Sequence, residues 1–170
     1  MTPTRSQSGA VPLDHYERSI LMALQEDCRL TNQELARKVG LSPSACWRRV
    51  KRLEDMGVIL RYTAILDPNK VGIGETVFAH VSMARHSRAP AVEFAELMRK
   101  QPEVMECYFT TGAADIILRV ATASVAAYDA FLEHVIFNAP GVSQVHSDFA
   151  LRRIKYETAL PLAAQTVRRA

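Results

Sequence analysis

Residues 30–57, LTNQELARKVGLSPSACWRRVKRLEDMG, decide the architecture of the first half of the chain. Thr31 and Glu34 form a T-x-x-E capping box, a pairing that opens a helix by satisfying its first backbone N–H groups. Gly40 stands where a helix ends on a left-handed residue. The spacing therefore predicts a short helix that begins after Thr31 and ends at Gly40.

The same stretch predicts a second helix almost at once. Ser42 is a good N-cap and Pro43 suits the first helical position, so the helix runs from there to Met56, which a glycine follows. An earlier helix over 14–27 opens with its own capping box. Two helices joined by a short turn that contains glycine form the helix-turn-helix arrangement, whose second helix enters the major groove of DNA.

Positive charge gathers on the same stretch. The chain of 170 residues has a formal net charge of +3, and the whole excess lies in residues 1–74. Between positions 37 and 61 only Glu54 and Asp55 oppose the basic residues Arg37, Lys38, Arg48, Arg49, Lys51, Arg52 and Arg61. Such a patch attracts a polyanion, although charge alone favours a merely solvated helix face.

Helical geometry decides between these two interpretations. At about 100° per residue, Cys46, Val50 and Leu53 fall on one side of the second helix, where they would pack on the other helices. Arg48 and Arg52 fall on the opposite side, one turn apart, and a guanidinium fork suits the edge of guanine. The arrangement favours DNA binding over a solvated face.

Lys51 and Arg49 are better suited to phosphates, which fix register without reading sequence. Trp47 lies at the flank, where it could stack on the DNA backbone or cover the helix edge, and we favour the packing role. The complete set of expected DNA contacts is Ser42, Ser44, Trp47, Arg48, Arg49, Lys51, Arg52 and Arg61.

The second half predicts an α+β domain. A strand over 58–66 would act as a wing or a hinge, and the later elements follow the order β-α-β-β-α-β of a ferredoxin-like fold. The expected strands are 75–83, 104–111, 116–121 and 142–155, and the expected helices are 89–100 and 124–138. One face of such a sheet needs a cover, and the outward Phe78 and Ile117 favour a second copy of the chain, although lone surface apolar residues are common.

The loop Gly112-Ala113-Ala114-Asp115 joins the two central strands. It is typical of a hairpin in which glycine supplies a positive φ and aspartate caps the turn. A functional interpretation is also open, because exposed backbone N–H groups could hold a carboxylate and Asp115 could accept from an ammonium group. Together these groups match the two charged ends of a free amino acid.

Other function classes find little support in the sequence. No apolar run approaches the ~20 residues of a membrane span and the N-terminus lacks an apolar signal core, so we expect a cytoplasmic protein without a membrane partner. Three widely spaced cysteines make a disulfide framework or a thiolate zinc site improbable. The five histidines are scattered, no hydrolase motif is present and Gly72 and Gly74 form only a lone G-x-G, so we expect no enzyme, no metal and no cofactor.

These patterns divide the chain into segments. We expect a disordered tail over 1–12, a winged helix-turn-helix domain over 13–60, and a hinge strand and linker over 61–74. A ferredoxin-like effector-binding and oligomerisation domain would follow over 75–157, with a C-terminal tail over 158–170.

The chain resembles the leucine-responsive regulatory (Lrp/AsnC) family of transcription factors over about residues 13–162. The resemblance lies in LDHYERSILMALQEDCRLTNQELARKVGLSPSACWRRVKRLEDMGVI (13–59), ILDPNKVGIG (65–74), PEVMECYFTTGAADIILRV (102–120) and PGVSQVHSDFALRRIKYETALPL (140–162). It implies a DNA-binding transcriptional regulator that forms dimers and assembles further, often to octamers. It also implies an amino-acid effector bound between dimers.

By this resemblance, effector contacts fall on Tyr108, Thr110, Gly112, Ala113, Ala114, Asp115 and Ser147. Alanines occupy loop positions where family members often carry an aromatic or charged residue, so the effector stays open, with cysteine or an apolar amino acid as candidates. The alternative function is an amino-acid-binding regulatory or structural subunit that does not bind DNA.

Overall fold

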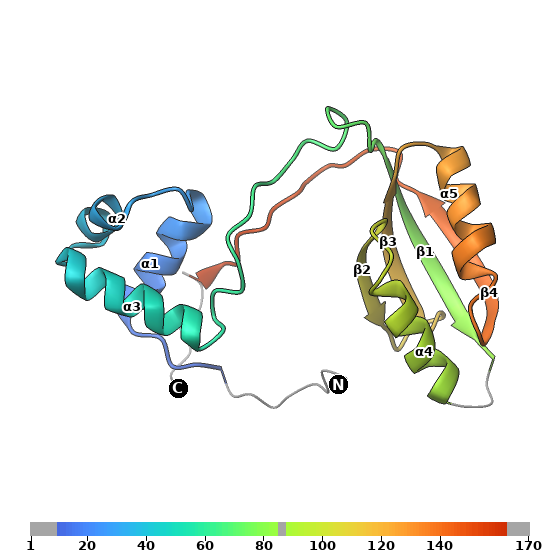
Figure 1. Ribbon diagram of the computed structural model, residues 1–170, viewed down its shortest axis with the longest axis horizontal. Coiled ribbons are helices and arrows are strands. Elements are labelled where there is room, and N and C mark those ends of the chain that lie inside the picture. The colour runs from blue at the N-terminus through green and yellow to red at the C-terminus, as the bar shows by residue number, and fades with distance from the viewer. Residues whose placement is uncertain (1–9, 85–87, 163–170) are drawn as a thin grey trace. The chain divides into compact units, whose positions relative to one another are not determined.

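The computed structural model describes residues 10–84 and 88–162. They form two compact units, one of residues 10–64 with 155–162 and the other of residues 65–154 (Figure 1). Among the residues described, none of the helices has the length and apolarity that crossing a membrane requires. The tails expected over 1–12 and 158–170 lie partly outside the described residues.

Three helices build the first unit: α1 (His15–Glu26), α2 (Asn32–Val39) and α3 (Pro43–Asp55). Both predicted capping boxes are confirmed in both directions. At α2 the Thr31 hydroxyl accepts from the backbone N–H of Glu34, and a Glu34 carboxylate oxygen accepts from the backbone N–H of Thr31 at 2.8 Å. The local sequence therefore accounts for where these helices start.

The turn between α2 and α3 confirms the helix-turn-helix prediction. Gly40 is left-handed, with φ 70° and ψ 35°, and Ser42 caps α3 by accepting from the backbone N–H of Ala45 at 3.3 Å. The three helices enclose a core of buried side chains, namely Ile20, Leu21, Ala23, Leu35, Ala36, Cys46 and Leu53. The predicted inward face of α3 is therefore correct for Cys46 and Leu53, which are fully buried.

A C-terminal segment of the chain completes this unit. The side-chain amide of Gln25 in α1 donates to the carbonyl of Leu160 at 3.1 Å and accepts from its backbone N–H at 2.6 Å. One side chain thus pairs with both backbone groups of Leu160, as a neighbouring strand would. Leu162 packs against the same apolar core as the three helices.

The second unit is a four-stranded antiparallel sheet in the order β2-β3-β1-β4. Its elements are β1 (Glu75–Met83), α4 (Arg88–Met98), β2 (Val104–Phe109), β3 (Ile116–Thr122), α5 (Val125–Phe131), a π-helical turn η1 (Leu132–Ile136) and β4 (Val142–Phe149). The β-α-β-β-α-β order is as predicted, and β1 lies at the centre between β3 and β4.

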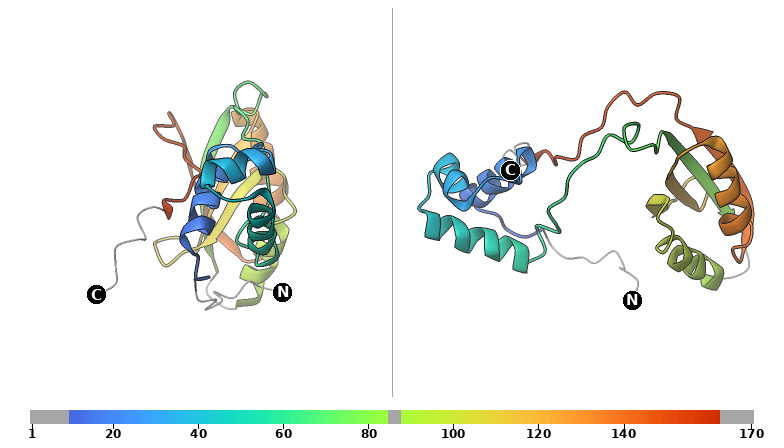
Figure 2. Two further views of the ribbon diagram at one scale, coloured as in Figure 1. Left: turned by 90° about the vertical axis from the view of Figure 1, so that its left-hand side faces the viewer. Right: turned by 45° about the horizontal axis from the view of Figure 1, so that its top comes forward.

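The two long helices of this unit, α4 and α5, lie against one face of the sheet (Figure 2). Alternate residues of β1 and β3 point into the core with side chains from α4, α5 and η1: Val77, Ala79, Val81, Phe94, Met98, Ile116, Leu118, Val120, Tyr128, Phe131 and Ile136. No described helix packs on the other face, where Phe78 is 39% exposed. The sheet thus has one covered face and one open face.

Three sequence expectations fail in detail. No strand forms over 58–66 among the described residues, because these residues have no ladder partner there. β4 stops at Phe149 rather than at Lys155, and Leu151 beyond its end is fully exposed. The helix expected over 124–138 begins as α5 but widens into the π-helical turn η1 at Leu132.

Gly141 is a position in the second unit that only glycine can occupy. Its φ is +78°, and a Cβ atom there would collide with the ring of Pro90 at the start of α4. This close approach lets the start of β4 pack against the start of α4. Only glycine offers both the left-handed backbone and the space.

Candidate DNA-binding and effector sites

Arg48 is the most available cation of α3. It is exposed, and among the described residues no side chain forms a hydrogen bond or ion pair with it. Ser44 and Trp47 are also exposed on this helix, and Ser42 is exposed at its start. Arg61 is exposed on the segment after α3 and likewise has no charged partner in the described part of the chain. Arg48, Trp47 and Arg61 are free to meet a ligand, whereas the hydroxyls of Ser42 and Ser44 lie 3.4 Å apart and Ser42 also caps α3.

Two other predicted DNA contacts, Arg49 and Arg52, are already occupied. Arg49 forms an ion pair with Asp14 and stacks over the ring of Tyr16, 5.3 Å from its centroid. Arg52 forms an ion pair with Glu17. The wheel placed Arg52 on the outward side of α3, where it is exposed, but took no account of a carboxylate from α1. Its assignment to base edges stays a prediction.

The Asp14 carboxylate shows the effect of this pairing. Burial raises its pKa, but hydrogen bonds from the Glu17 backbone N–H and from Arg49 outweigh burial and leave the pKa of Asp14 below its ordinary value. Asp14 is therefore charged at neutral pH and stays attractive to Arg49. The Asp14 carboxylate thus both caps α1 and binds Arg49, and each contact favours its charged form.

Lys51 makes its contacts within α3. Its ammonium lies 3.0 Å from Asp55 and 3.7 Å from Glu54, and the hydrogen bond to Asp55 raises the pKa of Lys51. Because these partners are solvent-exposed or half-buried, a phosphate could replace them at small cost. Lys51 therefore differs from Arg52, whose partner is buried.

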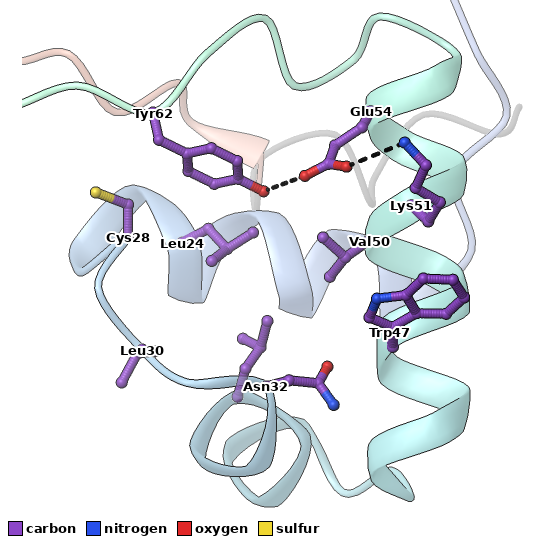
Figure 3. Close-up of a pocket in the computed structure, with 10 residues that line it drawn as sticks. Leu24, Cys28, Leu30, Asn32, Trp47, Val50, Lys51, Glu54 and Tyr62 are labelled. Carbon is purple, nitrogen blue, oxygen red and sulfur yellow. Dashed lines mark hydrogen bonds and ion pairs between the residues drawn. The ribbon is translucent and has the colours of Figure 1, made fainter.

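A pocket of about 260 Å³ lies beside Lys51 (Figure 3). Trp47 stands at its edge and keeps 59% of its surface exposed, so the packing role favoured from the sequence is only partly met. Tyr62, from the segment after α3, donates its hydroxyl to Glu54 at 2.9 Å. Burial and this carboxylate raise the pKa of Tyr62 to about 12. The contact anchors the start of the linker on α3.

The loop of Gly112 and Asp115 is tied to the end of β1. Asp115 accepts from the backbone N–H of Met83 at 2.7 Å and donates its own N–H to Val81 at 3.1 Å. Thr110 closes the loop by donating its hydroxyl to the carbonyl of Ala114 at 2.6 Å. Gly112 has no positive φ, so the expectation that it supplies one is wrong. Its exposed backbone stays open to a ligand.

The remaining predicted effector residues do not converge on one point. Tyr108 pairs with Ile117 on the open face of the sheet, where its hydroxyl donates to Glu106. Ser147 faces the covered side and shares a 2.7 Å hydrogen bond with the Tyr128 hydroxyl. The two side chains thus lie on opposite faces, which the strand alternation could have revealed. Ala113 is exposed and Ala114 is buried.

The open face of the sheet carries a polar cluster that sequence reasoning missed. His80 and His146 are cross-strand neighbours, and the Nε2 atom of each lies 3.2 Å from the Asp148 carboxylate. Among the described residues no group of three histidine, cysteine, aspartate or glutamate side chains has an arrangement that could hold a metal ion. The cluster joins β1 and β4 on this face.

Comparison with known proteins adds the family. Residues 13–59 match the model of a winged helix-turn-helix DNA-binding domain, and residues 76–160 match the Lrp/AsnC ligand binding domain. The chain belongs to the Lrp/AsnC family. It is 39% identical over 150 residues to the DNA-binding transcriptional activator DecR of Escherichia coli, covering 88% of this chain and 99% of that one.

Other members of the Lrp/AsnC family are equally similar. The Bkd operon transcriptional regulator of Pseudomonas aeruginosa is 40% identical over 150 residues, covering 88% of this chain and 98% of that one. A transcriptional regulator from Neisseria meningitidis, crystallised as its L-Met complex, is 40% identical and superposes with a TM-score of 0.85 over 90% of this chain and 99% of that one. DecR is thus a DNA-binding transcriptional activator and the other two relatives are transcriptional regulators. The fold of this chain is a winged helix-turn-helix joined to a ferredoxin-like domain.

Proposed function

We propose that this chain regulates transcription by binding duplex DNA through α3 in response to a free amino acid. Arg48 carries the DNA part of the proposal, because it is an exposed guanidinium on the helix that the turn presents and has no side-chain partner among the residues described. Ser44 and Trp47 lie beside it, while Ser42, Lys51 and Arg61 would contact phosphates. A regulator of the chromosome would act in the cytoplasm.

Two substitutions test the DNA-binding part. Arg48→Ala removes a fork that would read guanine, so it should lower specific affinity and relax base preference by about 1–3 kcal/mol at one position. Lys51→Ala should weaken binding to all sequences and reduce the salt slope by about 1. If both variants bind as the native chain does, α3 is not the reading helix.

The alternative is an amino-acid-binding subunit that does not bind DNA. A gel-shift experiment with a random-sequence duplex at low salt separates the two functions, because phosphate contacts give measurable binding without an operator. Retarded duplex supports the regulator. A duplex that migrates unchanged at all protein concentrations supports the alternative.

The effector part of the proposal rests on the loop of Gly112 and Asp115. Its exposed backbone can donate to a carboxylate. Oδ2 of Asp115 is used by Met83, and in the described part of the chain no donor contacts Oδ1, which could accept from an ammonium group. The L-Met complex of the Neisseria meningitidis relative supports an amino acid as the ligand class.

A thermal-shift screen of the common amino acids would identify the effector, since a ligand that binds only the folded state raises Tm. Asp115→Ala should abolish that shift while leaving DNA binding intact. Loss of folding in this variant would show that Asp115 serves only the turn. An unchanged ligand-induced shift would place the effector elsewhere.

The open face of the sheet supports assembly with a second copy, and further association to an octamer would bring several α3 helices to one DNA. Linked helices bind with higher avidity than single ones. An amino acid could change DNA affinity by favouring one assembly state, in proportion to its differential affinity for the states. Sedimentation of Phe78→Asp tests this surface, because a charge there should produce monomers, and an unchanged dimer would refute it.

A further inference from the structure

Glu17 is the one charged residue that is buried among the residues described, with 2% of its surface exposed. Its two carboxylate oxygens contact different partners. Oε2 accepts from the backbone N–H of Asp14 at 3.0 Å and completes the capping box of α1. Oε1 binds Arg52 of α3 and lies 3.9 Å from Arg49.

Capping alone does not explain this placement. Glu34 holds the corresponding position in the capping box of α2, where it accepts from the Thr31 backbone at 2.8 Å. Glu34 is exposed and forms no ion pair with the arginines of α3. A capping glutamate in this unit therefore needs neither burial nor a guanidinium, and Glu17 has both.

The burial of Glu17 decides how Arg52 responds to DNA. A surface ion pair exchanges one exposed partner for another at little cost. A buried carboxylate that loses its cation is left charged and poorly solvated, which is strongly unfavourable. A DNA phosphate therefore competes poorly for Arg52, whereas it competes easily for Lys51, whose partners are accessible.

Arg49 is restrained by the same surface. Three arginines and two acids, Arg48, Arg49, Arg52, Asp14 and Glu17, line one groove of about 520 Å³ between the start of α1 and α3. The acids hold Arg49 and Arg52, and the Tyr16 ring supports Arg49 from one side. In the described part of the chain, Arg48 is then the cation of the groove that lacks a charged partner.

We propose that Glu17 is a specificity-determining positioning residue, which withholds Arg52, and in part Arg49, from DNA so that Arg48 dominates the contact. Non-specific affinity grows with the number of phosphates that a protein neutralises. Each arginine held by α1 therefore lowers the affinity for non-specific DNA without affecting base recognition by Arg48. This inference rests on the proposed DNA-binding function.

The test compares Glu17→Gln with Glu34→Gln in the full chain. Both variants remove one carboxylate from the same position of a capping box and change the net charge equally, but only Glu17→Gln lets Arg52 leave without a buried charge behind. Binding to a random-sequence duplex is measured between about 50 and 200 mM salt, where log K falls with a slope of about −0.9 for each phosphate neutralised. Circular dichroism first confirms that each variant is folded.

We expect Glu17→Gln to bind the random duplex more tightly and with a steeper slope, by about 0.9 for each arginine released. Between 200 and 50 mM salt, its affinity should then increase about 3.5-fold more than that of the native chain for one arginine, and about 12-fold more for two. Glu34→Gln should keep the native slope. The double variant Glu17→Gln/Arg52→Gln should return toward the native slope, which a merely structural role of Glu17 would not produce.

Equal slopes for the native chain, Glu17→Gln and Glu34→Gln would overturn the proposal, as would a weaker but folded Glu17→Gln. If Glu17→Gln does not fold, Arg52→Gln and Lys51→Gln decide instead. The first should leave the slope unchanged and the second should reduce it by about 0.9, and equal reductions would overturn the proposal. If the native chain binds no duplex at low salt, the proposed DNA-binding function fails first.

Discussion

Removing the Asp115 carboxylate should destabilise the effector unit by a measurable amount. Its Oδ2 accepts from the backbone N–H of Met83 at 2.7 Å, which ties the loop to the end of β1. A hydrogen bond to a charged group contributes about 1.5–3 kcal/mol. Asp115 is exposed and water can replace it, so the lower end of that range, about 1.5 kcal/mol, applies to Asp115→Ala.

This magnitude can be read by differential scanning calorimetry. For a domain of 60–100 residues, about 1 kcal/mol shifts Tm by about 4–8 °C, so Asp115→Ala should lower the transition of the second unit by about 6–12 °C. The bond from the Asp115 N–H to Val81 uses the backbone and survives the substitution. The Tm shift therefore measures the contribution of the Asp115 carboxylate alone.

Asp67→Ala provides a matched control in the same unit. Asp67 accepts from the backbone N–H of Asn69 at 3.1 Å, a local contact two residues away in an exposed turn. Its loss should change stability by no more than about 0.5 kcal/mol. If Asp115→Ala and Asp67→Ala lower Tm equally, the bond to Met83 does not hold the loop and the reasoning is refuted.

Four further outcomes are expected. Thr31→Ala removes the cap of α2 and should cost about 1 kcal/mol in urea unfolding, with no loss contradicting the cap. Phe94→Ala empties a fully buried site under the sheet and should cost about 3–5 kcal/mol by the same measurement, so a loss below 1 kcal/mol would show that the core collapses around the gap. Gly141→Ala combines a left-handed backbone with a collision against Pro90 and should lower Tm, at a cost of at least about 1 kcal/mol, whereas an unchanged Tm would contradict the strain. The pKa of Asp14 in the folded protein lies below its ordinary value. Its contribution to the free energy of unfolding is therefore present above the unfolded pKa and is lost as pH falls through the folded pKa. Asp14→Asn should thus lose less stability below about pH 4 than the native chain does when both are titrated with acid.

The features that the sequence predicted well are those that depend on neighbouring residues. The capping boxes of α1 and α2, the left-handed Gly40 and the Ser42 cap need only contacts three or four residues apart. The strands of the second unit were predicted from alternation, and their sequence with the helices matched the β-α-β-β-α-β order. These local and periodic signals were sufficient to predict the helix-turn-helix unit and the ferredoxin-like unit.

The features that the sequence did not predict depend on distant partners. A helical wheel gives the direction of Arg52 but cannot show that the start of α1 brings Glu17 to it. Residues 58–66 have strand-forming side chains, yet a strand also needs an edge to pair with, and the described residues provide none. The position of Ser147 beneath α5 was predictable in direction from alternation, but its bond to Tyr128 was not.

The pairing of Gln25 with Leu160 bears on how the protein is synthesised. Translation proceeds from the N-terminus, so α1 to α3 leave the ribosome well before residues 155–162 exist. Between these two moments the whole sheet unit must be made. During that interval the nascent helix-turn-helix exposes the apolar surface that Leu162 later covers, so this unit reaches its final packing only after the sheet unit has been made.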